Sequence, residues 1–202
     1  MVRRVVPSDN SCLFAALGYV VHRDRGRAAA LRERAAAAVA ADADTFGEGF
    51  LGKPNAEYVA WLRDRDHWGG AIELSVLARV LNVQIGAADI VSKRLDVYGS
   101  DLPCPSDRVY LLYDGIHYDA VALSPVPGGG APEDFDTTRF VCGDTAAEAA
   151  VRALCAESHA ARHFTDTANF ALRCLVCQKG LKGENEAREH AKATGHINFG
   201  EY

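Results

Sequence analysis

The sequence predicts an α+β fold in which helices come first, a mostly antiparallel sheet follows, and a small metal-binding module ends the chain. Residues 12–81 carry apolar side chains at helical spacing. Residues 83–123 instead contain short runs of β-branched and aromatic residues, separated by Gly, Asp and Pro, as strands do. Near the C-terminus, Cys and His residues have the spacing of a metal site.

The first part of the chain predicts a short strand and four helices. Residues 2–6 form the strand, and Pro7 with the Ser-Asp-Asn-Ser cluster after it forms a turn. We expect helices over residues 12–21, 25–44, 55–66 and 71–81, with Asn55 as the N-cap of the third. Residues 25–44 are rich in Ala with interspersed Arg and Glu, which indicates a solvated amphipathic helix. Residues 46–54 contain three glycines and a proline and are expected to form a loop.

The second part predicts strands and a boundary. The expected strands cover residues 83–90, 94–98, 109–113, 118–123 and 135–141. Residues 124–134 are rich in Pro and Gly and form either a linker or a long surface loop. A helix over residues 145–163 has a weak apolar stripe of Ala146, Ala150, Leu154 and Ala161. We therefore expect a first domain over 1–123, a linker and a helix that can pack on it over 124–164, and a tail over 165–202.

The tail predicts a structural zinc site. Its four ligands are Cys174, Cys177, His190 and His196, with two, twelve and five residues between them. Two cysteines on a knuckle and two histidines at a helix end supply a closed tetrahedral site for Zn²⁺. We expect a ββα-type finger with a strand over 168–173, a helix over 184–194 and a core of Phe170, Leu181 and Ala187. A segment this small needs a metal to fold.

Composition narrows the classes of function. The chain has 202 residues, of which 49% are hydrophobic and 24% charged, as is typical of globular proteins. The net charge of −5 argues against general nucleic-acid binding through phosphates. No apolar run approaches the roughly 18 residues that span a membrane, and no secretory signal begins the chain. Six cysteines without such a signal favour a reducing compartment, so we expect a cytoplasmic location, with a nuclear pool as the alternative.

A single cysteine stands where the first turn becomes the first helix, in Asp9-Asn10-Ser11-Cys12-Leu13-Phe14. Unpaired backbone N–H groups and the helix dipole favour a thiolate there, and the thiolate is the nucleophile in cysteine catalysis. The alternative is a buried cysteine that acts as a small hydrophobic residue. Cys104, Cys142 and Cys155 have no partners at ligand spacing, and we expect them to be ordinary buried or half-buried residues.

His117 is the histidine best placed to act as a general base. It begins the second strand of a predicted hairpin, after an Asp114-Gly115 turn, and a strand holds it rigidly. Residues i and i+2 of a strand share a face, so Asp119 can orient its ring. The alternative is a turn histidine that simply bonds to Asp114 or Asp119. Three of the other histidines outside the tail, His22, His159 and His163, are expected on the surface. His67 either lines a cleft or is an ordinary histidine at the end of a helix.

Three blocks of the chain together resemble the ovarian tumour (OTU) family of deubiquitinating cysteine proteases. They are Asp9 to Phe14, the Trp68-Gly69-Gly70-Ala-Ile-Glu-Leu segment, and Tyr113 to Asp119, in the order of the family. With the finger, the chain is similar to the ubiquitin thioesterase subfamily that works with the valosin-containing AAA ATPase in endoplasmic-reticulum-associated degradation. The resemblance implies a papain-like OTU domain over 1–123 that hydrolyses isopeptide and thioester bonds at the ubiquitin C-terminus.

The resemblance also implies roles for residues. Cys12 matches the nucleophile and His117 the general base, while Asp9 and Asp119 both match positions for the third catalytic residue. The backbone of Asp9 to Cys12, with Asn10 and Ser11, would form the oxyanion hole. Trp68, Gly69 and Gly70 would border a channel for the ubiquitin tail.

Ubiquitin and polyubiquitin chains are the partners that this resemblance implies, in protein quality control and the unfolded protein response. The catalytic block begins nine residues into the chain, so we expect no ubiquitin-like docking domain ahead of it, and recruitment to the ATPase stays open. Two alternatives belong to other classes of protein. One is a catalytically weak adaptor that grips ubiquitin, and the other is an RNA- or protein-binding module that works through the finger.

Overall fold

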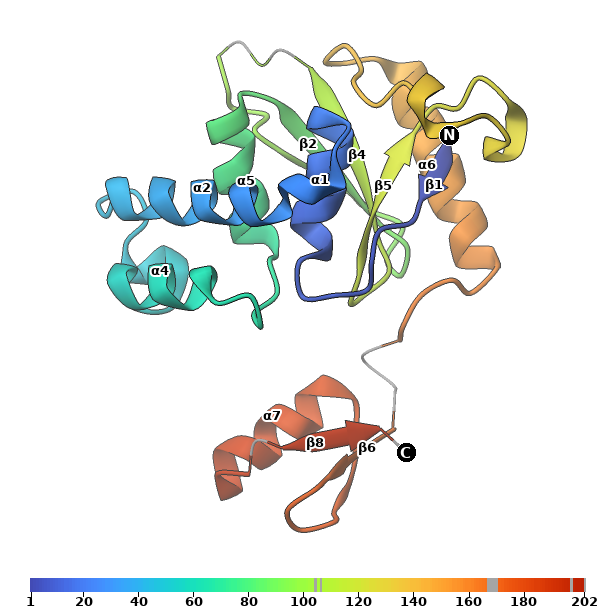
Figure 1. Ribbon diagram of the computed structural model, residues 1–202. Coiled ribbons are helices and arrows are strands. Elements are labelled where there is room, and N and C mark those ends of the chain that lie inside the picture. The colour runs from blue at the N-terminus through green and yellow to red at the C-terminus, as the bar shows by residue number, and fades with distance from the viewer. Residues whose placement is uncertain (104, 106, 167–170, 197, 202) are drawn as a thin grey trace.

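The computed structural model describes residues 1–103, 105, 107–166, 171–196 and 198–201. A five-stranded sheet with the order β1-β5-β4-β2-β3 lies at the centre of the larger unit (Figure 1). Its strands are β1 (Val2–Arg4), β2 (Gln84–Asp89), β3 (Leu95–Tyr98), β4 (Arg108–Tyr113) and β5 (Tyr118–Ala122). Only β2 and β4 pair in parallel, and the other three pairs are antiparallel. The predicted α+β fold is confirmed.

Helices cover both faces of this sheet. One side carries α1 (Cys12–His22), α2 (Ala28–Ala41), α3 (Glu48–Leu51), α4 (Asn55–Arg63) and α5 (Ala71–Leu81), and α6 (Thr145–Ala160) lies on the other (Figure 1). Strand β2 shows how the two cores divide, because side chains alternate along a strand. Ile85 and Ala87 pack in the core of α1, whereas Ala88 packs in the core of α6. Helix α1 is buried over the first ten of its 11 residues and forms the centre of the larger core.

Two predictions about the helical part were wrong. The expected loop over residues 46–54 contains the short helix α3, which Gly52 ends in the left-handed conformation at φ 74°. Asn55 is not an N-cap, because Pro54 holds that position at the start of α4. The Asn55 amide instead donates hydrogen bonds to the carbonyls of Val39 and Phe46, both at 2.9 Å. It therefore fastens the α2–α4 connection rather than the end of one helix.

Residues 135–141 do not form the expected strand. Thr137 makes one backbone pair with Leu123 and Phe140 makes one with Arg108, because the segment crosses the ends of β5 and β4 instead of running along either. The predicted stripe of α6 was also displaced, by one position at its first three residues, and Ala161 is exposed. The buried residues are Ala147, Val151, Cys155 and Ser158, since alanines line several faces of this helix and the larger Val151 and Cys155 decide which one packs.

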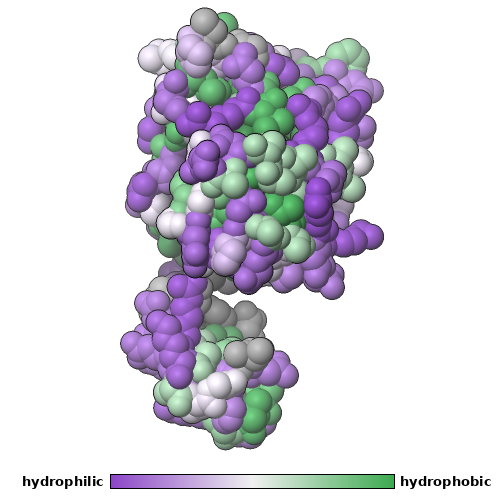
Figure 2. All heavy atoms as spheres, turned by 90° about the vertical axis from the view of Figure 1, so that its left-hand side faces the viewer, coloured by the Kyte–Doolittle hydropathy of each residue, from purple (hydrophilic) through white to green (hydrophobic). Residues whose placement is uncertain are grey.

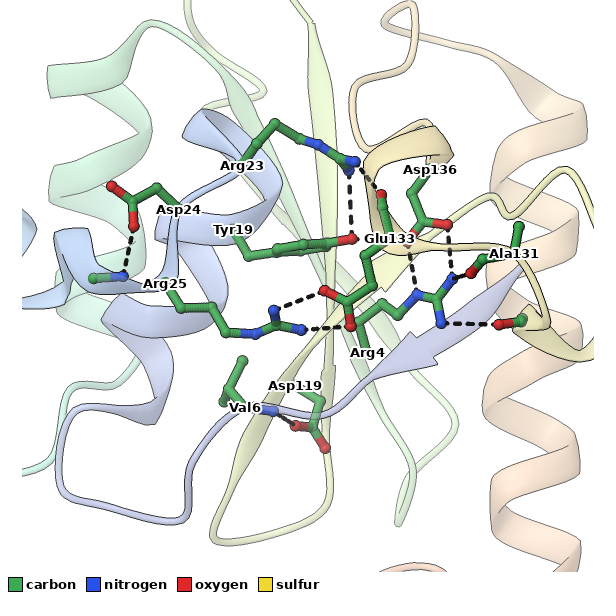
Figure 3. Close-up of polar contacts among 12 residues, drawn as sticks. Arg4, Val6, Tyr19, Arg23, Asp24, Arg25, Asp119, Ala131, Glu133 and Asp136 are labelled. Atoms are coloured by element: carbon green, nitrogen blue, oxygen red, sulfur yellow. Dashed lines mark hydrogen bonds and ion pairs between the residues drawn. The ribbon is translucent and has the colours of Figure 1, made fainter.

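The Pro/Gly-rich segment is fastened to the larger unit by charged groups (Figure 3). Arg4 donates to both carboxylate oxygens of Asp136 at 2.7 and 2.8 Å, and the Tyr19 hydroxyl donates to the same carboxylate at 2.7 Å. Arg25 pairs with Glu133 at 2.7 Å. Residues 124–164 therefore pack on the sheet and α1 along most of their length.

The tail forms a second, smaller lobe, seen below the larger unit in Figure 2. It contains β6 (Ala171–Cys174), β7 (Gly180–Lys182), α7 (Gly183–Thr194) and β8 (Phe199–Glu201), with the sheet order β7-β6-β8. Leu181 and Ala187 are buried in its core as predicted, and Phe170 lies outside the described residues. Among the residues described, no helix has both the length and the apolar character needed to cross a membrane.

Candidate active site

The Asp9–Cys12 loop ends at the first residue of α1. The Asp9 carboxylate accepts a hydrogen bond from the Ser11 N–H at 2.8 Å, which closes an Asx turn. The Cys12 N–H reaches the Asp9 carbonyl at 3.3 Å and the Asp9 N–H reaches the Pro7 carbonyl at 3.0 Å. Three of the four N–H groups of this loop thus already have partners, two of them on Asp9 and one on Pro7 just before the loop.

Cys12 is only 8% exposed, because α1 lies against the sheet from its first residue. Burial raises the pKa of its thiol, and the charges of Asp9 and Asp119 act in the same direction. Backbone N–H groups of Tyr118 and Leu13 oppose this effect by donating to the sulfur, but burial outweighs them. The sequence predicted that the helix N-terminus favours a thiolate. The donors from Leu13 and Tyr118 act in that direction, but desolvation of the charged form outweighs them.

His117, directly before β5, and Asp119, within β5, are in contact. The His117 Nε2 atom is 3.2 Å from Asp119 Oδ1. The turn before them is set by Asp114, whose carboxylate accepts from the His117 N–H at 2.8 Å, and by Gly115 at φ 107°. A hydrogen bond from the Thr165 N–H to the Asp114 carbonyl (2.8 Å) ties the chain before the finger to the same turn.

Asp119 is held by several donors. Its side chain is almost fully buried, it accepts from the Val6 N–H at 2.8 Å, and it pairs with Arg3 Nε at 2.5 Å (Figure 3 draws the Val6 bond). Asp9 has no such contact with the histidine, since its carboxylate bonds to Ser11. Of the two aspartates that the sequence left open, the structure therefore places Asp119 against His117.

Helix α1 brings the Cys12 sulfur to the start of β5, beside the residue that follows His117. The Tyr118 N–H that donates to the Cys12 sulfur belongs to the residue between His117 and Asp119. Because Nε2 of the imidazole is directed at Asp119, Nδ1 is the nitrogen left for the thiol. A cysteine, a histidine and an aspartate are thus brought into one site from residues more than 100 positions apart.

The Trp68–Gly70 segment borders the loop on its other side. The Trp68 indole N–H donates to the Asn10 side-chain oxygen at 2.7 Å, and Trp68 itself is 56% exposed. A side chain on Gly69 would meet the Phe14 ring at 3.0 Å, so this glycine lets the segment lie against α1. A side chain on Gly70 would meet open space. Of the two glycines predicted for a channel, Gly70 is the one that faces outward.

Two buried charged residues next to the site were missed by the sequence analysis. Glu73, 2% exposed, accepts from the Gly70 N–H at 2.7 Å and from the Tyr58 hydroxyl, and so holds the start of α5. Arg32, 5% exposed, lies behind the Asp9–Cys12 loop. Spacing could have indicated Arg32, because the buried residues Ala35, Ala36 and Val39 follow it by three, four and seven positions.

The finger brings its four predicted ligands together. The ligand atoms of Cys174, Cys177, His190 and His196 all lie within 4.8 Å of one another. The Cys177 sulfur is 3.4 Å from His190 Nε2, and the Cys174 sulfur is 3.7 Å from His196 Nδ1. In tetrahedral zinc sites sulfur and nitrogen ligands lie about 3.6 Å apart, given the usual metal–ligand lengths. The residues present fit a zinc ion.

A buried thiol at a helix start, with a histidine–aspartate pair on the adjoining strand, defines the class of this protein as a cysteine protease. Residues 7–118 match the family of OTU-like cysteine proteases. Residues 168–202 match the family described as the C-terminal C2H2-type zinc finger of ubiquitin thioesterase OTU1. The chain therefore belongs to the OTU family of cysteine-type deubiquitinases.

Individual relatives support the same assignment over the whole chain. The chain is 51% identical to the Arabidopsis thaliana OVARIAN TUMOR DOMAIN-containing deubiquitinating enzyme 2, over all of the chain and 98% of that protein. It is 46% and 44% identical to ubiquitin thioesterase OTU1 of Dictyostelium discoideum and of Homo sapiens, but spans only 61% and 57% of those two proteins. A solved OTU domain in complex with ubiquitin superposes with a TM-score of 0.70 at 25% identity, covering 81% of this chain and 89% of that one.

Proposed function

We propose that this protein hydrolyses isopeptide and thioester bonds at the C-terminus of ubiquitin, with polyubiquitin chains as substrates. The observation that carries the proposal is the contact of His117 Nε2 with Asp119 beside the Cys12 sulfur. The substrate is supported by the full-length similarity to a deubiquitinating enzyme and by the similarity to an OTU domain solved in complex with ubiquitin.

Cys12 is the nucleophile and His117 is the general base in this proposal. Because the thiol is neutral at rest, its proton passes to His117 Nδ1 as the sulfur attacks the carbonyl of the ubiquitin C-terminal glycine. Asp119 fixes the ring through Nε2 and stabilises the imidazolium that forms. Arg3 and the Val6 N–H hold Asp119 in place, so the orienting carboxylate does not turn away.

The Asp9–Cys12 loop stabilises the oxyanion that this attack creates. The Ser11 N–H is directed at the Asp9 carboxylate, so the Asn10 N–H is the first donor for the oxyanion. The Cys12 N–H becomes the second donor by giving up its long, 3.3 Å contact with the Asp9 carbonyl. One such donor is commonly worth about 3 kcal/mol. His117 then protonates the leaving lysine amine, and the same histidine activates the water that hydrolyses the thioester.

Cleavage of a panel of diubiquitins of all linkages tests this function. Wild type should cleave at least one linkage and Cys12→Ala should cleave none, while Cys142→Ala, at a half-buried cysteine outside the site, serves as the matched control. A ubiquitin with a C-terminal electrophile should label Cys12. Labelling without turnover would instead favour the ubiquitin-binding adaptor, and full activity of Cys12→Ala would exclude Cys12 as the nucleophile.

The four ligands of the finger hold a structural Zn²⁺ ion in this proposal. The support is the sulfur–nitrogen distances and the match to a C2H2 finger family. The ion would join strand β6, the turn after it and α7, and it has no part in the hydrolysis. Metal analysis of the purified chain should find about one zinc per protein, and Cys174→Ser should lose it.

A cytoplasmic location, a nuclear pool and a role in endoplasmic-reticulum-associated degradation and the unfolded protein response are further proposals. Their support is the likeness to the ubiquitin thioesterase OTU1 proteins. Recruitment by the valosin-containing AAA ATPase is part of the same proposal. Co-precipitation of that ATPase with Cys12→Ala, together with slowed turnover of a misfolded endoplasmic-reticulum substrate, would support the proposal. The absence of both effects would refute it.

A further inference from the structure

Arg32 of α2 donates hydrogen bonds to two segments that border the active site. Its Nη2 donates to the Asn10 carbonyl at 2.8 Å and to the Ser11 hydroxyl at 3.2 Å. Its Nη1 donates to the carbonyls of Leu62 and Asp64 at 3.0 and 3.3 Å, where α4 ends. One planar guanidinium therefore links the Asp9–Cys12 loop to the chain that leads toward Trp68.

The environment of this guanidinium is unusual. It stacks over the Phe14 ring at 4.4 Å, and it forms no ion pair with any residue that the structure describes. Burial accordingly lowers the pKa of Arg32, although an arginine stays charged at any physiological pH. A buried cation without a carboxylate partner is costly, so its contacts with carbonyl groups are the ones that compensate it.

Both polar groups of the Asn10–Ser11 peptide, its carbonyl and its N–H, are hydrogen-bonded to side chains. Arg32 binds its carbonyl oxygen, and the Asp9 carboxylate accepts from its N–H. In a planar trans peptide these two groups point in opposite directions, so the two contacts together fix the orientation of the plane. The neighbouring peptide groups carry the Asn10 and Cys12 N–H groups, whose direction depends on this plane.

We propose that Arg32 is a positioning residue for catalysis, which together with Asp9 locks the Asn10–Ser11 peptide so that the flanking N–H groups face the oxyanion. This inference rests on the proposed function, because it assigns a task within that reaction. Arg32 touches no reacting atom. Its contribution should therefore appear in kcat, with little change in KM or in the reactivity of the thiol.

The test compares variants of the full-length chain on a ubiquitin substrate with a fluorogenic leaving group. Arg32→Lys keeps the charge but loses the planar guanidinium that bonds to both segments. We therefore expect kcat to fall by about 100-fold and KM to change by no more than about twofold. Alkylation of Cys12 by iodoacetamide, which needs no oxyanion hole, should keep its rate. Arg34→Lys on the exposed face of α2 and the buried Val39→Ala are the controls for charge and for stability.

Asp9 supplies a second measurement that does not depend on the folding of an Arg32 variant, since its side chain is exposed. Asp9→Ala should lower kcat, and Asp9→Asn, which keeps an acceptor oxygen, should restore most of it. Combining Asp9→Ala with Arg32→Lys should cost little more than the larger single effect, because both act on one peptide group.

Three results would overturn the inference while leaving the proposed function intact. The first is a kcat of Arg32→Lys equal to that of Arg34→Lys. The second is a fall in the activity of Arg32→Lys that is fully explained by less folded protein, as in Val39→Ala. The third is a double variant in which the effects of Asp9→Ala and Arg32→Lys on kcat multiply. A wild type that cleaves no ubiquitin substrate would overturn both proposals.

Discussion

Two ionisable residues of the site, Cys12 and Asp119, are both buried but differ in their partners. Asp119 has three donors directed at its carboxylate, whereas the Cys12 sulfur has only backbone N–H groups. Burial without a charged partner disfavours the ionised form, and this is why the pKa of Cys12 is raised. In the proposed reaction the Cys12 thiol therefore gives its proton to His117 as the sulfur attacks.

The pH dependence of alkylation should report this raised pKa. The thiolate fraction of Cys12 grows only as the pH rises toward and past the ordinary thiol value of 9.0, so its rate with iodoacetamide should still be climbing at about pH 8.5. Peptide mass spectrometry of quenched samples measures this rate for Cys12 alone, with glutathione as the reference thiol. A rate that levels off below about pH 7 would indicate a resting thiolate–imidazolium pair instead.

The two aspartates should respond differently to the same substitution. Asp119→Asn replaces the carboxylate that faces His117 Nε2, and kcat should fall by at least about 100-fold, as in other triads. Asp9→Asn keeps the acceptor for the Ser11 N–H, so it should lower kcat much less. Steady-state kinetics on a fluorogenic ubiquitin substrate separates them. The reverse order of effects would assign the orienting role to Asp9.

Among the structural elements, the segment of residues 124–144 changes how the chain divides into units. The composition of residues 124–134 predicts a linker or a long surface loop, and Asp136, which follows it, is buried between Arg4 of β1 and Tyr19 of α1. Burial alone would raise the pKa of Asp136, but the hydrogen bonds from Arg4 and Tyr19 outweigh it and lower the pKa below its ordinary value of 3.8. Burial and the same carboxylate raise the pKa of Tyr19 to about 12. The segment thus acts as a strap that fastens α6 to the sheet.

Removing the charge of Asp136 should loosen this strap. Asp136→Asn leaves the half-buried Arg4 without its anion and should lower the free energy of unfolding by about 3 kcal/mol near pH 7. A lowered folded-state pKa means that the stabilisation is present above pH 3.8 and is lost as the pH falls through the folded-state value. The difference between variant and wild type should therefore shrink below about pH 3.8.

Urea denaturation at several pH values measures that difference. Asp134→Asn is the matched control, because Asp134 is an exposed aspartate two residues earlier in the same segment. A difference that stays constant from neutral to strongly acidic pH would mean that Asp136 stabilises the strap without being ionised.

For the whole molecule, the structure indicates two units with different sources of stability. The larger unit has two extensive apolar cores, one on each face of its sheet. The finger has only a few buried apolar residues, chiefly Leu172, Leu181 and Ala187. So small a core cannot offset the conformational entropy of ordering the segment, so the finger should depend on its metal ion.

Removal of the metal should therefore unfold one unit and spare the other. Dialysis against a strong chelator should abolish the dispersed NMR signals of α7, while the melting temperature of the larger unit stays unchanged. Cleavage of a fluorogenic ubiquitin substrate should persist, because the Cys12 site lies outside the finger. Cys177→Ser should behave like the chelated protein. A parallel loss of activity or of the main melting transition would show that the finger supports the catalytic unit.

How much of this molecule could be predicted from its sequence depends on the distance over which each feature is determined. The five helices of more than four residues in the larger unit, the hairpin and the finger follow from spacing within about 20 residues, and the sequence located them. The strand predicted for residues 135–141 was wrong. The segment has the composition of a strand, but it pairs only with the ends of β4 and β5. The prediction missed the short helix α3, because the three glycines of residues 46–54 indicated a loop more strongly than its two apolar residues indicated a helix.

The sequence by itself determined the family, the pairing of Cys12 with His117 as a prediction, and the four metal ligands, since each is a local pattern of residue types. Only the tertiary structure decided that Asp119 rather than Asp9 contacts His117, that Arg32 holds the loop, and that burial raises the pKa of the Cys12 thiol. The physical reason is separation along the chain: the donors that fix Asp119, Val6 and Arg3, lie 113 and 116 positions away from it. Such contacts, and the burial that shifts a pKa, exist only once α1 and β1 have packed against β5.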